Sequence, residues 1–446
     1  MVTKQTGLIV IGALLALAVT VPCSVLAQEQ GPIQKGQYLG AASCASNVCH
    51  GSVQPRDTYN VRQDEYFIWL NQDRHAQAYK VLFNDESALI GRNMKLRGKP
   101  YESAVCLDCH ALHMPAAQQA RELDLTEGIS CEACHGPAGG WIDKHTESGW
   151  THEMSVKEGM RDLRSIEGRA ENCLACHLGN DKKTVDHELI AAGHPDLIFE
   201  LDNYSAVMPP HWLGFAAKKN KEGLQETHGV RAWAVGQAVA FREGMQQLAR
   251  RARSESWPEF AEMNCYACHH DLKDGEWRQV RGYRFKAGQP PWNPARYAVL
   301  RQLVAAFAPQ ERDRLNAQVQ RLAAAIAKMS TPRQEVAAAA TDLANTMDRV
   351  IPRIAQASID TATARELAGA IAGDVPYLLD AEIHSIEQAV MGMNSLISSM
   401  SRSDPGQANG QIARAMDKLY DAVQDRERFD RQQFIRYMKE LQGQFR

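Results

Sequence analysis

The chain has 446 residues, with 50 Lys and Arg against 53 Asp and Glu, so its formal net charge is −3. A nearly neutral chain without a basic stretch lacks the charge pattern of a nucleic-acid-binding protein, and we expect no nucleic-acid partner. The length allows two or three domains. The 11 Cys and 15 His are therefore the most informative part of the composition.

The first residues have the pattern of a secretory signal. Lys4 precedes an apolar run over residues 8–21, and Val25-Leu26-Ala27 predicts cleavage after Ala27. The run is shorter than the ~20 apolar residues that a membrane span needs, although without cleavage it would anchor the chain in a membrane. We expect residues 1–27 to be a signal peptide that directs the chain to an oxidising compartment outside the cytoplasm.

A His directly follows the second Cys of a pair at five places in the chain. The five motifs are Cys44-x4-Cys49-His50, Cys106-x2-Cys109-His110, Cys131-x2-Cys134-His135, Cys173-x2-Cys176-His177 and Cys265-x2-Cys268-His269. C-x-x-C-H is the attachment site of a c-type haem, in which two thiols bind the porphyrin and the His becomes an axial iron ligand. We therefore predict five covalently bound c-type haems. Because bacteria attach such haems in the periplasm, we expect the protein there.

Zinc and disulfides are the alternatives for these cysteines. Structural zinc usually takes four ligands, so five Cys pairs do not divide evenly among zinc ions, and zinc does not explain the His after each pair. Disulfides explain the even count but again not the His. The first motif has four residues between its cysteines, which leaves two possibilities: a haem attached through a wider loop, or one held by Cys49 alone with Cys44 free.

The Cys and His residues divide the chain into two regions. All five motifs lie within residues 36–290, which we predict to be a pentahaem cytochrome c domain with little regular structure around stacked haems. The interval per haem is too short for a separate apolar core, so the haems themselves must supply much of it. A helix is predicted from Val230 to about Arg253. The fold class is mainly α.

Residues 293–446 are predicted to form a bundle of amphipathic helices. Asn293-Pro294 is a typical helix start. Apolar residues then recur at spacings of three and four, which is the helical period. Breaks are expected near Pro309, Pro352, Pro376 and Pro405, and a capping box at Thr331-Pro332 with Gln334. His384 lies beside the apolar stripe and is expected to be a packed or surface residue.

The second axial ligand of each iron decides what the iron can do. A second His gives a six-coordinate iron that carries electrons, whereas an open face can bind a small molecule. Nine further His precede the bundle: His75, His113, His145, His152, His187, His194, His211, His228 and His270. His187 and His194 lie two helical turns apart between the fourth and fifth motifs, so they are the best candidates for the last two haems, followed by His211 and His228.

Residues 101–178 resemble the tetrahaem cytochrome c-554 family, and Arg74-His75-Ala76-Gln77-Ala78 resembles its segment after the first haem. The matching stretches are Cys106-Leu-Asp-Cys-His110, Gly128-Ile-Ser-Cys-Glu-Ala-Cys-His-Gly-Pro137, Asp143-Lys-His145 with Ser148-Gly149, and Asn172-Cys-Leu-Ala-Cys-His-Leu178. Hydroxylamine oxidoreductases and pentahaem nitrite reductases share the wider haem packing. The resemblance implies an electron carrier with reactivity toward nitric oxide.

The resemblance also implies particular ligand pairs. By it, His145 would lie opposite His50, and His75 opposite His135, while the haem at His110 would be five-coordinate. His113, three residues after His110, cannot reach the far side of its own haem. The chain departs from the family in its first motif, its fifth motif, its bundle, and in having no His directly before Cys173.

Two functions follow from these expectations. The first is a periplasmic electron carrier with redox partner proteins as donor and acceptor, in which the bundle offers a surface for docking or self-association. The second is an enzyme that acts on a small nitrogen or sulfur compound at an open haem near His110. We favour the carrier, which would not be an enzyme; a structural or filament-forming subunit is a third possibility.

Overall fold

The computed structural model describes residues 33–56, 61–212, 229–269, 289–381, 383–403, 410–424 and 426–445. Within these ranges the chain forms α-helices and short 3-10 helices, with two isolated bridges and no β-strand. The prediction of a mainly α protein is confirmed. No helix in these ranges is long and apolar enough to cross a membrane, and the predicted signal peptide lies outside them.

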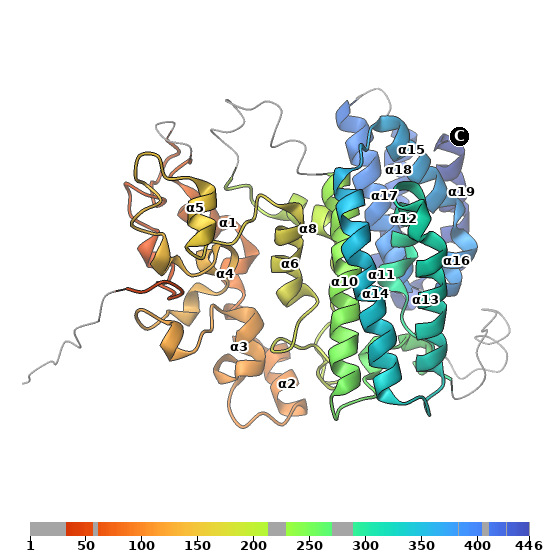
Figure 1. The fold of residues 1–446 in the computed structure, drawn as a ribbon, viewed down its shortest axis with the longest axis horizontal. Coiled ribbons are helices and arrows are strands. Elements are labelled where there is room, and N and C mark those ends of the chain that lie inside the picture. Colours follow the sequence, from red (N-terminus) through yellow and green to blue (C-terminus); the bar gives the residue numbers. More distant parts are fainter. Residues whose placement is uncertain are drawn as a thin grey trace, which may run out of the picture.

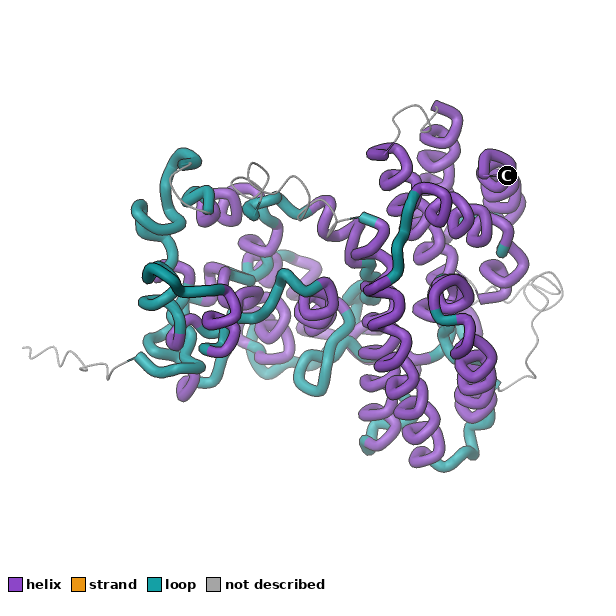
Figure 2. Tube along the Cα trace, turned by 45° about the horizontal axis from the view of Figure 1, so that its top comes forward, coloured by secondary structure: helices purple, strands orange, loops and turns teal. Residues whose placement is uncertain are grey.

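The region with the first four Cys motifs consists of short helices joined by loops (Figures 1 and 2). Its α-helices are α1 (Glu65–Gln72), α2 (Asp85–Asn93), α3 (Ala104–His110), α4 (Cys131–His135), α5 (His152–Lys157), α6 (Ile166–His177), α7 (His187–Ala191) and α8 (Leu201–Val207). Most of its buried apolar side chains form small separate clusters. The described residues of this region thus form several small apolar clusters, and it stays a prediction that haems supply much of the core.

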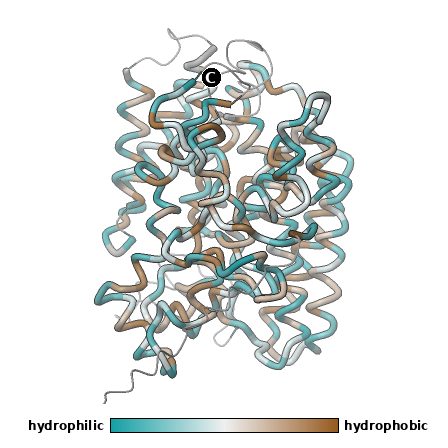
Figure 3. The backbone as a smooth tube through the Cα atoms, turned by 90° about the vertical axis from the view of Figure 1, so that its left-hand side faces the viewer, coloured by the Kyte–Doolittle hydropathy of each residue, from teal (hydrophilic) through white to brown (hydrophobic). Residues whose placement is uncertain are grey.

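The rest of the described chain forms long helices that pack side by side. They are α10 (Val230–Arg253), α11 (Ala295–Ala298), α12 (Leu300–Phe307), α13 (Pro309–Ala327), α14 (Arg333–Gln356), α15 (Thr361–Gly373), α16 (Val375–Ala381), α17 (Ile383–Ser403), α18 (Gly410–Gln424) and α19 (Arg431–Phe445). One continuous apolar cluster runs through them. Hydrophilic and hydrophobic residues are interspersed along the turns of the chain (Figure 3). In α13 and α14 the buried apolar residues recur at the helical period, as predicted.

Helix α10 joins the two regions. It packs along α14 on one side and against α6 and α8 on the other, and it lies between them in Figure 1. Arg242 of α10 is buried, and its guanidinium contacts Glu167 and Glu171 of α6. By sequence α10 falls in the predicted haem domain, yet it packs as part of the long helices. The domain boundaries themselves stay a prediction.

Some predicted helix boundaries differ from the structure. Pro309 begins α13 and Pro376 lies in the first turn of α16, as a break nearby requires, but Pro352 lies inside α14. Pro352 has no N–H to donate to the carbonyl four residues earlier, yet the helix continues past it to Gln356, so the break predicted there is wrong. The capping box at Thr331 is absent, because α14 begins at Arg333 with Pro332 as its N-cap. Pro405 lies outside the described residues.

Glycine at position 392 allows α17 to approach α10 closely. A Cβ atom there would lie 2.9 Å from Nε1 of Trp233, which is fully buried. We expect Gly392→Ala to lower the free energy of unfolding by about 1–3 kcal/mol, because the overpacked ring must shift. Denaturant unfolding measures this change. Gly443→Ala is the control, because a Cβ atom at this position of α19 meets no other atom within 4 Å. We expect its free energy of unfolding to rise by about 0.5–1 kcal/mol. An equal decrease in both variants would contradict the close approach of α17 to α10.

Candidate haem sites

Short helical turns present the Cys motifs. Cys106–His110 ends α3, α4 is the motif Cys131–His135 itself, and Cys173–His177 ends α6. The fifth motif begins with a 3-10 turn at Cys265–Ala267, while the first follows the 3-10 turn Ala41–Ser43. Because residues three apart lie on one face of a helical turn, the two thiols of a C-x-x-C motif point the same way. This arrangement suits two bonds to one porphyrin edge.

Each motif His faces a second His across a gap. The ring-centroid separations are 6.4 Å for His50–His145, 6.2 Å for His75–His177, 6.4 Å for His110–His194, 6.3 Å for His135–His211 and 6.2 Å for His187–His269. Two metal–nitrogen bonds of roughly 2 Å, with about 1.1 Å from each ring centre to its nitrogen, add to about 6 Å. The gaps are therefore the right size for a metal ion between two imidazoles.

Hydrogen bonds to one ring nitrogen orient five of these ten rings. Nδ1 is bonded to Glu65 in His50, to Asp73 in His75, to the Ala78 carbonyl in His110, to the Ile142 carbonyl in His145 and to the Pro195 carbonyl in His194. With Nδ1 occupied, Nε2 of each ring remains for a metal. Outer hydrogen bonds of this kind fix the tautomer and orientation of metal-binding His.

Burial also favours the form of His that binds metals. It lowers the pKa of His135 and of His177 to about 4, so both rings are neutral at pH 7. Neutral imidazole is the metal-binding form. Phe199 stacks on the His177 ring with centroids 5.0 Å apart, and Tyr204 meets it edge-on at 5.4 Å. These two aromatic contacts hold the His177 ring in place.

Thiols from different motifs meet in pairs. The Cys44 side chain is hydrogen-bonded to Cys131, and the Cys109 side chain to Cys176. None of the ten cysteines that the structure describes forms a disulfide. The first motif thus lies beside the third, and the second beside the fourth.

Arg161 links the remaining neighbours among these four motifs. Its Nη1 donates to the Ala133 carbonyl of α4 and, at 2.8 Å, to Oδ1 of Asn172 in α6. The third motif therefore lies beside the fourth. The first four motifs form one continuous group in the order one, three, four, two.

Glu132, between the two cysteines of the third motif, has a structural role that sequence reasoning missed. Its carboxylate is fully buried and accepts hydrogen bonds from the backbone N–H groups of Leu39, Gly40 and Ala138 at 2.7–3.0 Å. Burial raises the Glu132 pKa, and these donors oppose the rise. The chain before the first motif is thereby fastened to the third. The only sign of this role in the sequence was a charged residue placed between the two cysteines of a motif.

The glycine that follows the third motif is required by its backbone. Gly136 has φ +83°, and a Cβ atom there would lie 2.7 Å from the Gly159 carbonyl oxygen. Any other residue would be strained and would clash. The Cys-Glu-x-Cys-His-Gly sequence is thus explained by packing as well as by its thiols.

The structure corrects two expectations that came from the resemblance. His75 faces His177 and not His135, because Asp73 holds its Nδ1 at 2.9 Å and turns the ring toward α6. The place opposite His135 is taken by His211, which was only a secondary candidate. The expected open face at His110 is covered by His194. His194 was predicted for one of the last two haems, so that assignment is also corrected, and His75 takes the place opposite the fourth motif. The pairing of His50 with His145 agrees with the expectation, and His187 lies opposite His269.

The other described His residues are bonded to carboxylates. His113 is paired with Asp108 through Nδ1, whereas His152 and His384 use Nε2 for Asp162 and Asp196. None of these three faces a motif His. His228 and His270 lie outside the described residues. Nine His were predicted to bind iron, and the structure places each of them in a facing pair: His50, His75, His110, His135, His145, His177, His187, His194 and His269. That they bind iron stays a prediction.

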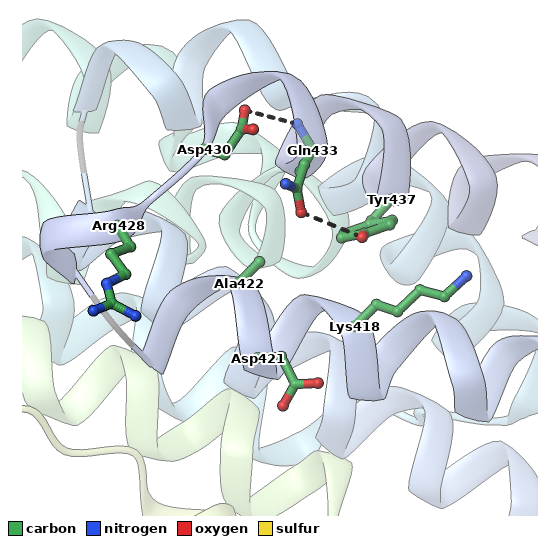
Figure 4. A pocket seen from close by; sticks show the side chains of 7 residues that line it. All are labelled: Lys418, Asp421, Ala422, Arg428, Asp430, Gln433 and Tyr437. Carbon is green, nitrogen blue, oxygen red and sulfur yellow. Dashed lines mark hydrogen bonds between the residues drawn. The ribbon is translucent and has the colours of Figure 1, made fainter.

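A surface hollow between α18 and α19 offers no comparable chemistry. It is lined by Lys418, Asp421, Ala422, Arg428, Asp430, Gln433 and Tyr437, and Figure 4 shows their side chains. The Asp430 carboxylate accepts the Gln433 N–H at 3.1 Å and so caps α19. Its lining has no Cys or His, so it lacks the residues of the haem motifs.

These features, with helical Cys-x-x-Cys-His turns and facing His rings, define the class of c-type cytochromes, which bind haem covalently and transfer electrons. Comparison with known families agrees. Residues 43–136, about a fifth of the chain, match the family described as cytochrome c554 and c-prime. No curated protein and no solved structure matches the chain. The wider relationship to hydroxylamine oxidoreductases stays a prediction.

Proposed function

We propose that the protein is a periplasmic electron carrier with five c-type haems, each attached to one Cys motif and held between two His. The observation that carries the proposal is the set of five His pairs with ring centroids 6.2–6.4 Å apart. A bound haem supplies one-electron chemistry, and two His ligands leave no position for a substrate. The chain's own residues orient the ligands and bring neighbouring haems together.

The contacts between motifs support electron transfer within the protein. Motifs one, three, four and two adjoin through the thiol contacts and Arg161. The fifth motif is tied to the second, because His187 and His194, which face His269 and His110, lie on one short segment. All five proposed haems thus belong to one connected group. The donor and acceptor would be other redox proteins at the ends of this group.

The alternative of an enzyme with an open haem near His110 has less support. Its basis was the open face implied by the resemblance, and His194 occupies that side with centroids 6.4 Å apart. The Nδ1 atoms of both rings are hydrogen-bonded to backbone carbonyls, so both rings are held facing one another. We therefore propose no substrate.

Intact-mass analysis and spectroscopy of the purified holoprotein test the proposal. We expect a mass that corresponds to the chain without residues 1–27 plus five haems, a fully low-spin electron paramagnetic resonance spectrum, and no change of the ferrous spectrum with carbon monoxide. Mapping of the peptide with Cys44 decides whether that thiol is bound. Fewer than five haems, or a gas-binding haem in the native protein, would overturn the proposal.

A further inference from the structure

We propose that Asp196, held by His384 and Arg426 of the C-terminal helices, is a positioning residue that keeps His194 facing His110. The inference rests on the proposed function, in which His194 is an iron ligand. It gives the C-terminal helices a task at a particular haem: they decide whether that haem stays closed.

We call the group of Asp196, His384, Arg426 and Glu387 the clamp, and hydrogen bonds fix its geometry. Oδ2 of Asp196 is hydrogen-bonded to Nε2 of His384 at 2.6 Å. Nη1 of Arg426 donates to both carboxylate oxygens of Asp196, at 3.0 and 3.1 Å. Arg426 is fixed in turn by Glu387, whose two oxygens lie 2.7 and 3.1 Å from the guanidinium. Asp196 therefore binds two residues that lie 188 and 230 positions later in the chain.

The clamp is more than a surface ion pair. The side chains of Asp196 and Arg426 are 27% and 30% exposed, and those of His384 and Glu387 both 12%. Exposed pairs contribute little because water screens them, whereas networks of partly buried charges lose much less to screening. A shared network of four side chains is thus able to hold a backbone segment in place.

The chain between Asp196 and His194 is short and stiff. Only Pro195 separates the two residues, and the proline ring fixes its own φ. On the other side of His194, Gly193 has φ +118°, and Nδ2 of Asn93 donates to the Ala192 carbonyl at 2.9 Å. The His194 turn is therefore held at two ends, by α2 before it and by the clamp after it.

Removal of the clamp should act locally, because the following chain has its own attachments. Nε2 of Gln388 donates to the Phe199 carbonyl at 3.2 Å, and Nδ2 of Asn203 donates to Ser395 at 3.0 Å. Helix α8 and the aromatic contacts on His177 do not depend on Asp196. The expected consequence is a freer His194, with the other four His pairs unchanged.

The test compares ligand release at one haem among purified holoprotein variants. In Asp196→Ala we expect the fraction of haem without its second ligand to rise by about tenfold or more, as when other outer partners of metal ligands are removed. The release appears as a high-spin resonance signal and as carbon monoxide binding to the reduced protein. His194→Ala gives the reference signal of a fully open haem at His110. The double variant with both Asp196→Ala and His194→Ala should show the same signal as His194→Ala, that of one open haem.

Matched controls separate positioning from general stability. Glu311→Gln removes a similar contact, Arg349 to Glu311 at 3.3 Å, between α13 and α14, two helices that contain no His. It should leave the spectra unchanged. Arg426→Gln serves as a second clamp variant should Asp196→Ala not fold. Low-spin spectra without gas binding in both clamp variants, when His194→Ala opens its haem, would overturn the positioning role alone. Gas binding by the native protein would instead overturn the proposed function.

Discussion

Replacement of Glu132 by alanine is expected to lower the free energy of unfolding by about 3 kcal/mol or more. The substitution leaves the N–H groups of Leu39, Gly40 and Ala138 buried without an acceptor, and each buried unsatisfied group costs about 1–3 kcal/mol. Because Leu39 and Gly40 directly precede the 3-10 turn before Cys44, the first motif should loosen first. Denaturant unfolding, followed by circular dichroism in the haem absorption band, measures the loss.

Two variants show whether the three hydrogen bonds are the cause. Glu122→Ala removes a carboxylate that is exposed and close in sequence, so its unfolding should change by less than about 0.5 kcal/mol. Glu132→Gln keeps the shape but presents an NH2 group to N–H donors, so most of the loss should remain. A Glu132→Ala protein as stable as the Glu122→Ala protein would show that the backbone donors find other partners.

The proximal sites could be predicted from the sequence because their chemistry is local. Two thiols and a His within five residues, as in Cys106–His110, suffice to specify haem attachment. The second ligands depend on how distant segments meet, and single positions decide this. Asp73 turns His75 toward His177, and the segment with His211 fills the place that the resemblance gave to His75. Neither contact has a signature in the spacing of His residues.

The helices of the C-terminal region were predicted because burial follows the helical period. Leu315, Val319, Leu322 and Ile326 of α13 are all buried, as their spacing predicted. The next residue of that pattern, Met329, is 49% exposed, since α13 ends at Ala327. Periodicity indicates which face of a helix is buried but not against what. It therefore could not predict that α10 packs both on α14 and on the haem-bearing α6.

The same limit applies to the clamp at Asp196. Sequence reasoning placed His384 as a packed or surface residue, which describes its burial but not its partner. Its contact with Asp196 joins segments 188 residues apart. Ion pairs between distant segments leave no periodic pattern, so only the three-dimensional arrangement connects the C-terminal helices to the His194 turn.

Glu200 should make the protein less stable as the pH rises from about 5 to 8. This carboxyl group caps α8 and is almost fully buried, and burial raises its pKa from 4.5 to about 7. Between these two values the folded protein binds the proton and the unfolded chain does not, so stability falls as the pH rises. The contribution is complete below about pH 4.5 and lost above about pH 7. The shift corresponds to a loss on the order of 3 kcal/mol.

The variant Glu200→Gln isolates this effect, because glutamine resembles the protonated carboxyl group and does not titrate. Denaturant unfolding at pH 5, 6, 7 and 8 should show the native protein losing stability relative to the variant, with most of the change between pH 5 and 7. The neighbouring Asp202 is present in both proteins, so its effect is common to both. Glu366→Gln, an exposed position on α15, should show no such difference. A constant offset between native protein and Glu200→Gln from pH 5 to 8 would mean that Glu200 stays ionised in the fold, with the N–H groups of Asp202 and Asn203 compensating for its burial.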